Sequence, residues 1–210
     1  MIQALLFDLD GTLVDNNELI FQTFEHLFQE HLGKTIPRNE IVNTFGKPLE
    51  EVMEIYFPNQ GQIYAQHYRS YNIANHDNLI TLCPQVIEGL EYLKSKGLKI
   101  ALVTSKARPT TDQSLKLFHL EKYFDIIITP ELTENHKPHP DPALKALEYL
   151  DIPPQNAIMI GDSPYDIQCG HAAGCKTAAV SYSAYDMEKL LATNPDYIID
   201  TIRELDAYLV

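Results

Sequence analysis

From residue 84 onward, short apolar segments alternate with amphipathic ones, and this alternation constrains the fold more than any other feature of the sequence. Four apolar segments have the length of buried strands: 99–103, 123–129, 157–160 and 176–180. Apolar residues at helical spacing mark the segments 86–96, 110–117, 142–150 and 165–173. Such alternation is typical of a parallel sheet that helices cover on both faces. We therefore expect an α/β fold with three layers, α/β/α.

Strand-like residues also open the chain, and a different pattern separates them from the rest. The segment Ile2–Leu9 is apolar and is bounded by Gly11. Over residues 15–80, apolar residues recur at helical spacing and no convincing strand occurs. We expect residues 1–14 and 81–210 to form one core domain that shares a single sheet, with residues 15–80 inserted into it as a helical cap domain.

The composition restricts the partners of the chain. With 210 residues, 45% of them hydrophobic, the chain can bury a sizeable core, and its formal net charge of −13 argues against a nucleic acid or an anionic membrane as partner. No apolar run is long enough to span a bilayer, and no basic leader segment precedes the first strand. The three cysteines form no disulfide-scaffold pattern. We expect a cytoplasmic monomer or homodimer.

The first predicted strand ends in two carboxylates, Asp8 and Asp10, followed by Gly11. Side chains two residues apart in a strand point to the same face, so the two carboxylates would leave the strand end side by side. Carboxylates this close repel each other. A proton on one of them, or a cation between them, would relieve the repulsion.

Polar residues also follow the later predicted strands. Thr104 and Ser105 follow the second strand, Lys137 follows the third, and Asp162 and Asp166 follow the fourth. Ligands of an open parallel sheet bind at the carboxyl ends of its strands, so these groups would converge on one edge. The carboxylates there favour a hard divalent cation, and Mg²⁺ fits best. The lysine, the threonine and nearby backbone N–H groups suit phosphoryl oxygens, so we expect phosphoryl transfer through an aspartyl-phosphate.

The residues that carry this chemistry also carry a family resemblance. They form four segments: Asp8-Leu9-Asp10-Gly11-Thr12-Leu13, Leu102-Val103-Thr104-Ser105, Lys137-Pro138 and Gly161-Asp162-Ser163-Pro164-Tyr165-Asp166. In this order they resemble the four motifs of the haloacid dehalogenase superfamily, and the resemblance spans the whole chain. It implies a Rossmann-like core, an inserted helical cap and an activity similar to that of the phosphoglycolate phosphatase-like branch. The segments Val103–Arg108 and Tyr68–Asn72 also resemble a pyrophosphatase subgroup of Gram-positive bacteria.

The resemblance implies roles for the four aspartates. Asp8 matches the nucleophile that attacks phosphorus, and Asp10 matches the general acid–base that protonates the leaving oxygen and then activates water. Asp8, the Asp10 carbonyl and Asp162 match the Mg²⁺ ligands. Asp166 resembles a second carboxylate that either binds the metal through water or orients its neighbours.

The resemblance implies phosphate-binding residues as well. Thr104 and Lys137 match the side chains that bind the phosphoryl oxygens, and Ser105 supports them through its backbone. Gly11 would let the backbone approach the phosphate and contribute an N–H group. The substrate would be a small phosphorylated molecule.

More than one reaction is compatible with these motifs. Asp10 favours hydrolysis of a phosphate ester or anhydride, because dehalogenases and phosphonate-cleaving relatives usually lack that aspartate. Sugar phosphomutases keep it but typically carry a cap histidine where this chain has Ile20. We expect phosphoglycolate or a similar phosphomonoester as substrate, and inorganic pyrophosphate is the next candidate. A sugar phosphomutase is the alternative enzyme, and a phospho-ligand binding protein is the alternative outside enzymes.

Substrate choice would lie in the cap. Gly46 and Lys47 sit where related caps place a loop that touches the substrate, so Lys47 would bind a second anionic group; a solvated loop lysine is an equal alternative. Arg69 is a further candidate for that contact, although a surface ion pair is the simpler interpretation. The spacing of Tyr64, Tyr68 and Tyr71 indicates packing within the cap.

Overall fold

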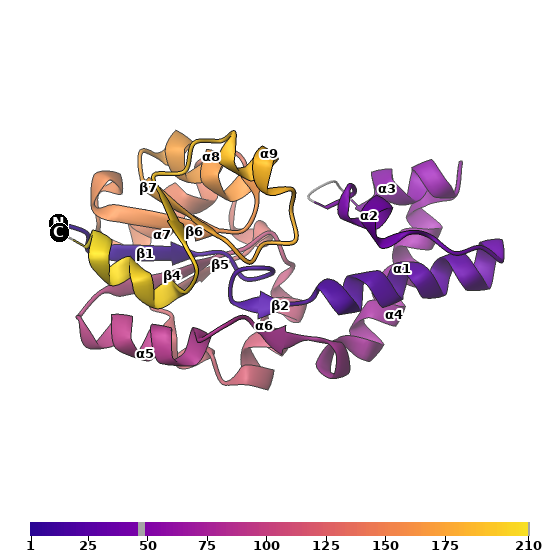
Figure 1. The fold of residues 1–210 in the computed structure, drawn as a ribbon, viewed down its shortest axis with the longest axis horizontal. Helices are drawn as coiled ribbons and strands as arrows, with labels where there is room; N and C mark the ends of the chain where they lie inside the picture. Colours follow the sequence, from indigo (N-terminus) through magenta and orange to yellow (C-terminus); the bar gives the residue numbers. More distant parts are fainter. Residues whose placement is uncertain (46–48, 210) are drawn as a thin grey trace. The chain divides into compact units, whose positions relative to one another are not determined.

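The structure is a computed structural model that describes residues 1–45 and 49–209. It divides into two compact units, which we call the core unit (Met1–Asp15 with Leu82–Val210) and the cap unit (Asn16–Thr81) (Figure 1). The chain leaves the core after β2 (Val14–Asp15) and returns at β3 (Thr81–Leu82). In the core, the backbone N–H of Cys83 donates to the carbonyl of Leu13 at 3.0 Å. The insertion therefore begins and ends at neighbouring points.

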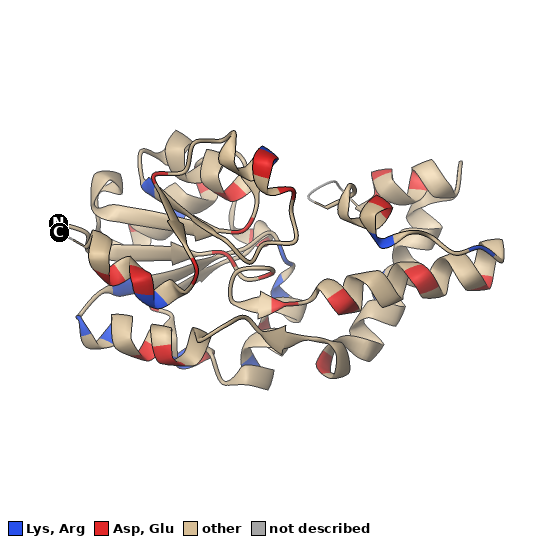
Figure 2. Ribbon diagram, in the orientation of Figure 1, with Lys and Arg blue, Asp and Glu red and all other residues tan. Residues whose placement is uncertain are grey.

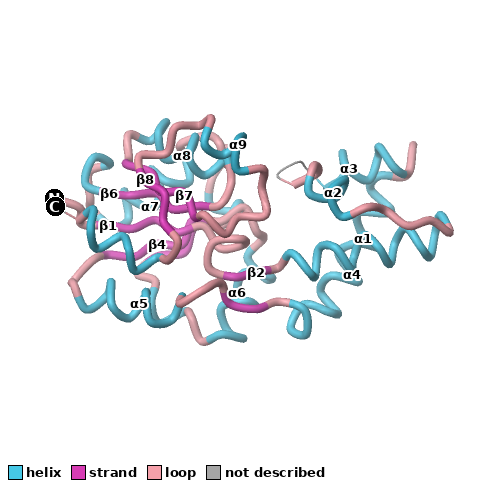
Figure 3. Tube along the Cα trace, viewed as in Figure 1, coloured by secondary structure: helices cyan, strands magenta, loops and turns pink. Residues whose placement is uncertain are grey.

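Among the described residues, six parallel strands form the sheet of the core unit, in the order β5-β4-β1-β6-β7-β8 (Figure 3). Their bounds are β1 Ala4–Phe7, β4 Lys99–Val103, β5 Ile126–Ile128, β6 Ala157–Gly161, β7 Lys176–Val180 and β8 Tyr197–Ile199. The predicted α/β fold is confirmed. The strand order differs from the chain order, because β1 lies between β4 and β6.

Helices cover both faces of this sheet, as the apolar character of its strands requires. They are α5 (Val86–Ser95), α6 (Arg108–Phe118), α7 (Asp141–Leu150), α8 (Pro164–Ala173) and α9 (Met187–Leu191). Residues of α7 and α8 share one buried cluster with Leu6 of β1, Val103 of β4 and Met159 of β6. Figure 1 shows α5 on the opposite side of the sheet from α8. The cysteines are free and buried, and Cys169 and Cys175 pack in the same cluster.

The register of the central strands aligns their carboxyl ends. Phe7 at the end of β1 lies opposite Leu102 of β4 and Ile160 of β6. Pairing continues for one more residue, because the N–H of Asp8 donates to the carbonyl of Ile160 at 2.9 Å. The residues that follow these strands therefore emerge side by side at one edge of the sheet.

The cap unit is helical, with α1 (Asn17–Leu32), α2 (Arg38–Val42), α3 (Leu49–Tyr56) and α4 (Gly61–Leu79). Phe24, Phe28 and Met53 lie in its buried cluster. Aromatic contacts join the helices: Tyr64 stacks on Phe57 at 3.7 Å between ring centroids, Tyr68 packs edge-on against Phe24 and Tyr71 stacks on His26. The tyrosine spacing is thus explained by packing. No helix in the described part of the chain combines the length and apolarity needed to cross a membrane.

The strand predicted over residues 123–129 is shorter in the structure, where β5 spans Ile126–Ile128. Two helical segments differ from the sequence pattern as well. The pattern predicts a helix over residues 62–71, whereas α4 continues to Leu79, through a segment whose side chains are mostly polar and give no amphipathic signal. The pattern also predicts a final helix over 202–209, whereas the structure has a 3₁₀ helix, η4, over Ile202–Tyr208. Tertiary contacts decide both cases: Asn72 of α4 donates to Thr23 of α1 at 3.4 Å, and η4 packs on α5.

Candidate active site

The carboxyl ends of the central strands bring charged and polar residues to one edge of the sheet. Asp8 follows β1, Thr104 follows β4 and Asp162 follows β6, while Lys137 comes from the loop after β5. The side chains of Asp8 and Lys137 are only 8% and 4% exposed. Charged groups this deeply buried require partners, and the contacts of Lys137 supply them.

Lys137 contacts more elements than any other side chain we describe at this edge. Its ammonium group donates to Asp8 Oδ1 at 2.5 Å, to Asp166 Oδ1 at 2.6 Å and to the carbonyl of Val103 at 3.1 Å. An ammonium group has three N–H donors, so these acceptors use all of them. The lysine therefore joins β1, β4 and α8 and offsets the repulsion between the two carboxylates.

Burial and charge set the protonation of this cluster. Burial raises the pKa of Asp8 to about 7, although Lys137 acts in the opposite direction. Burial, with the charges of Asp166 and Asp8, also holds the pKa of Asp162 well above its usual range. Burial alone would lower the pKa of Lys137, but the charges of Asp166 and Asp8 outweigh it, and its pKa lies above the ordinary value. The single positive charge of Lys137 does not balance the negative charge that Asp8, Asp162 and Asp166 would carry if all three were ionised.

This donor set fits a hard divalent cation. Asp8, Asp162 and Asp166 are all buried, and each offers a carboxylate oxygen that lies within 4.8 Å of the other two. Oxygen ligands and an excess of negative charge are what Mg²⁺ prefers in proteins. A cation there would also favour the ionised forms of Asp8 and Asp162, opposing the effect of burial on their pKa values.

Asp166 has a structural task that limits its other contacts. It forms a capping box at the start of α8: its Oδ2 accepts from the Ser163 hydroxyl at 2.5 Å and from the Ser163 backbone N–H at 3.1 Å. Its Oδ1 accepts from Lys137. Because both carboxylate oxygens are engaged, the geometry favours an orienting role for Asp166 over direct ligation of a metal.

Two motif glycines allow the close packing of this site. Gly11 has a φ of +82°, which suits glycine, and a Cβ atom there would lie 2.2 Å from Asp162 Oδ2. A Cβ atom on Gly161 would lie 2.2 Å from the Cβ atom of Asp166. A larger residue at either position would displace the carboxylate beside it.

The predicted phosphate-binding residues after β4 occupy the same edge. Thr104 is buried, and its hydroxyl accepts from the backbone N–H of Lys106 at 3.1 Å. Ser105 is exposed in the loop that follows. The structure thus gathers Thr104, Lys137 and the carboxylates within the core unit, as the motif order indicated.

A contact between Lys106 and Asp10 was not predicted. The ammonium group of Lys106 donates to Asp10 Oδ1 at 2.9 Å. The sequence offered one signal, because Lys106 stands two residues after Thr104 at the end of a predicted strand. The pairing itself depends on how the loops after β1 and β4 run, which periodicity does not report.

The loop after β7 contributes two further contacts that the sequence did not indicate. The hydroxyl of Ser183 donates to the carbonyl of Asp162 at 2.6 Å, and the hydroxyl of Tyr182 donates to the carbonyl of Thr12 at 2.8 Å. Both link this loop to the two motif loops that carry the aspartates. No motif marks Tyr182 or Ser183, so only the structure identifies them.

The sequence proposed three residues of the cap unit, Gly46, Lys47 and Arg69, as contacts for the substrate. Gly46 and Lys47 fall outside the described residues. Arg69 forms an ion pair with Glu50 at 2.6 Å, with about half of each side chain exposed, which is the surface pairing that the sequence made the simpler interpretation. The substrate contact predicted for Arg69 stays a prediction.

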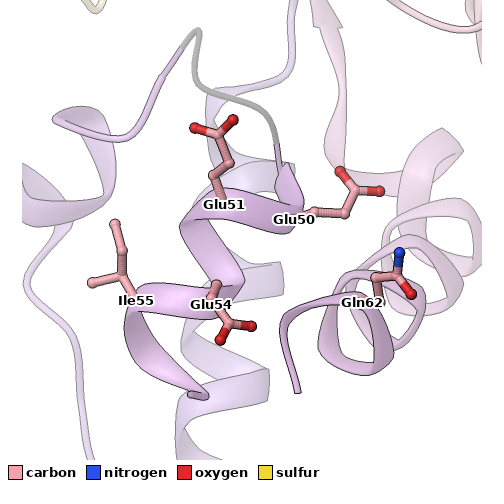
Figure 4. Close-up of a pocket in the computed structure, with 5 residues that line it drawn as sticks. All are labelled: Glu50, Glu51, Glu54, Ile55 and Gln62. Carbon is pink, nitrogen blue, oxygen red and sulfur yellow. The ribbon is translucent and has the colours of Figure 1, made fainter. Parts of the chain in front are cut away.

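A pocket of the cap unit, about 430 Å³ in volume, is lined by Glu50, Glu51, Glu54, Ile55 and Gln62 (Figure 4). Two of its three carboxylates are engaged in the fold: Glu50 binds Arg69, and Glu54 accepts from the backbone N–H groups of Asn59 and Gly61 at 2.6 and 2.9 Å. Three glutamates repel an anion. This pocket therefore does not suit a phosphorylated ligand.

This chain is similar to known proteins in both sequence and structure. Residues 5–180 match the haloacid dehalogenase-like hydrolase family. A Clostridium perfringens protein with the provisional name pyrophosphatase PpaX is 44% identical, over 98% of this chain and 96% of its own. A Bacillus cereus protein named pyrophosphatase PpaX is 38% identical, over 97% and 94%. A haloacid dehalogenase-like hydrolase of Streptococcus pneumoniae has a similar structure, with a TM-score of 0.88, 32% identity and coverage of 100% and 99%.

The family match covers most of the chain and includes all the motif loops that meet at the sheet edge. The relatives align over nearly their full length, so the cap insertion is part of the similarity. The arrangement of buried aspartates around a lysine and the similarity agree: the chain belongs to the haloacid dehalogenase-like hydrolase family and is a phosphohydrolase.

Proposed function

We propose that the enzyme hydrolyses a small phosphorylated substrate in a Mg²⁺-dependent reaction, through an aspartyl-phosphate formed on Asp8. The observation that carries this proposal is the buried position of Asp8 between a charged lysine and two further aspartates. A carboxylate held there is oriented for attack, and the surrounding charges match a phosphoryl group.

Each residue has a task in the two steps. An oxygen of Asp8 forms a bond to phosphorus while the bond to the leaving oxygen breaks, and that oxygen keeps the electron pair. Asp10 donates a proton to the leaving oxygen. In the second step Asp10 takes a proton from water, the water oxygen attacks phosphorus, and phosphate leaves Asp8. The Thr104 hydroxyl and the backbone N–H of Ser105 donate to the phosphoryl oxygens, and Lys137 supplies positive charge beside them. The N–H of Gly11 donates to the carbonyl of Val14 at 2.7 Å, so the contribution of Gly11 is the close packing that it allows.

Asp8, Asp162 and the carbonyl of Asp10 would hold the Mg²⁺ ion, and Asp166 would orient the cluster through Lys137 and Ser163. When bound, the ion offsets negative charge on the carboxylates and the phosphoryl oxygens. Lys137 supplies the positive charge that belongs to the chain itself.

Inorganic pyrophosphate is the substrate that we propose. The sequence motifs favoured phosphoglycolate as substrate. Relatives 38–44% identical over nearly the whole chain carry the name pyrophosphatase, and for this reason we favour pyrophosphate. A mutase is less compatible, because the position of its cap histidine holds Ile20, which packs against the apolar cluster of the cap unit. An isoleucine cannot transfer a proton.

The test is a phosphate-release assay with Mg²⁺ on pyrophosphate, phosphoglycolate and sugar phosphates. We expect pyrophosphate to give the highest kcat/KM and Asp8→Asn to lower turnover by at least about 10³-fold, because the amide is not a nucleophile. Circular dichroism would check that the variant keeps the native fold. Undiminished turnover by Asp8→Asn would refute the assignment of the nucleophile, and a higher kcat/KM on phosphoglycolate would refute the substrate.

A further inference from the structure

Lys106 is a second lysine at the sheet edge, and it contacts a different carboxylate from Lys137. Its ammonium group lies 2.9 Å from Asp10 Oδ1, and its side chain is 11% exposed. Its backbone is held on both sides: the N–H donates to Thr104 Oγ1, and the carbonyl accepts from Thr111 Oγ1, each at 3.1 Å. The ammonium group is therefore carried by a loop that is anchored to the end of β4 and to α6.

Lys106 and Lys137 differ in how many N–H donors of the ammonium group remain available for a ligand. Lys137 uses all three N–H donors on Asp8, Asp166 and Val103. Within the described part of the chain, Lys106 donates to Asp10 alone, so two of its donors stay available for a ligand. Positive charge is scarce in this protein, which has 16 lysines and arginines against 29 acidic residues, spread over the helices and loops of both units (Figure 2).

We propose that Lys106 determines a preference for substrates whose leaving group is itself an anion, such as the phosphate that pyrophosphate releases. This inference rests on the proposed function, in which Asp10 faces the leaving oxygen. A group within hydrogen-bond distance of the Asp10 carboxylate lies on the leaving-group side of the reaction. Lys137, by contrast, lies against Asp8, on the side of the phosphoryl group that is transferred.

The chemistry of the leaving group explains why a cation is needed there. An alcohol develops charge only on the oxygen that leaves, and a proton from Asp10 neutralises it. A phosphate leaving group carries charge on its other oxygens as well, which one proton does not remove. Lys106 stabilises that charge while the bond between phosphorus and the bridging oxygen breaks and the bridging oxygen keeps the electron pair.

The experiment compares two substrates whose leaving groups are similarly acidic but differ in charge. Pyrophosphate releases phosphate, whereas p-nitrophenyl phosphate releases a phenol whose only ionisable oxygen is the one that leaves. We would measure kcat/KM for both with the wild type, Lys106→Met and Lys106→Arg. Lys99→Met is the matched control, because Lys99 begins the same strand, β4, and its exposed ammonium group pairs with Asp125.

We expect Lys106→Met to lower kcat/KM on the order of 10²-fold for pyrophosphate and much less for p-nitrophenyl phosphate, because an oriented donor is lost only for the charged leaving group. Lys106→Arg should recover part of the loss on pyrophosphate, and Lys99→Met should change neither value. Lys106→Gln, which keeps a hydrogen bond to Asp10 without the charge, replaces the methionine variant if that variant does not fold.

Equal losses on both substrates would overturn the inference, since Lys106 would then act only by positioning Asp10; hydrolysis of pyrophosphate by the wild type would leave the proposed function standing. A wild type that cleaves p-nitrophenyl phosphate but not pyrophosphate would overturn both the substrate and the role of Lys106. Binding of imidodiphosphate, which is not hydrolysed, offers an independent readout: Lys106→Met should weaken it more than it weakens binding of inorganic phosphate.

Discussion

At the scale of single residues, the site depends on one ammonium group that faces more than one buried carboxylate. Lys137 is fully charged and nearly inaccessible, and it pairs with Asp8 and Asp166. Removing one partner of a buried ion pair leaves the other charge uncompensated, which costs more than the pair contributes. The lysine is therefore expected to matter for folding as well as for catalysis.

Lys137→Met tests this dependence. At pH 8 without metal, we expect the free energy of unfolding to fall by about 3–5 kcal/mol, because Asp8 and Asp166 lose their counter-charge in a buried site. Adding Asp8→Asn to the same chain should restore part of that loss. Urea denaturation measures both. Lys99→Met, which removes an exposed lysine, should change the free energy by less than about 1 kcal/mol; a similar value for the two single variants would contradict the buried-pair argument.

At the scale of elements, the start of α8 links helix stability to the geometry of the site. In the capping box, the carboxylate of Asp166 accepts hydrogen bonds from Ser163, and it also accepts one from the ammonium group of Lys137. The helix then ends at Gly174, which adopts the left-handed conformation expected of a C-terminal cap. Loss of the hydrogen bonds between Ser163 and Asp166 would therefore also leave Asp166 and Lys137 less well oriented.

Ser163→Ala is expected to lower the free energy of unfolding by about 1 kcal/mol, as for other helix caps. It should also lower kcat, because Asp166 loses the hydroxyl that orients it. Ser163→Thr should retain most of both. Asp186 caps α9 by accepting from the N–H of Glu188, so Asp186→Ala gives a stability loss of the same kind without contact to Asp166. If both alanine variants lowered kcat equally, the proposed link between cap and site would fail.

At the scale of the whole molecule, we expect metal binding and folding to be coupled through the core unit. Burial raises the pKa of Asp8 to about 7 and also raises that of Asp162, so the folded state holds protons on these groups that the unfolded chain has released. In the absence of metal, these groups make the core less stable as the pH rises from about 4 through about 7. A cation that needs the ionised carboxylates should reverse that loss.

We expect Mg²⁺ to raise Tm, and to raise it more at pH 8 than at pH 5.5, where Asp8 is largely protonated. The stabilisation approaches about 2.7 kcal/mol when free Mg²⁺ is 100-fold above Kd. Asp162→Asn should remove most of the shift, whereas Asp112→Asn, which alters an exposed carboxylate paired with Arg108, should leave it intact. Thermal denaturation with Mg²⁺ and with a chelator measures the effect; an equal shift in the Asp162 and Asp112 variants would refute this metal site.

The sequence by itself determined the class of fold and indicated which motif residues follow the strands at one edge of the sheet, although it did not mark Tyr182 or Ser183. Strand and helix periodicity are local properties, so the alternation after residue 84 predicted the strands, and polar residues at strand ends marked the sheet edge where Asp8, Thr104, Lys137 and Asp162 meet. Local patterns did not predict helix where a segment lacks amphipathic character, as in the second half of α4.

Only the tertiary structure decided which partners these residues have. Strand order places β1 between β4 and β6, and the loops then bring Lys137 to Asp8 and Asp166 and bring Lys106 to Asp10. Such contacts join residues far apart in the chain, and they depend on loop paths and on the burial of charge. Periodicity contains neither, which is why the motif aspartates could be read from the sequence while the pairing of Lys106 could not.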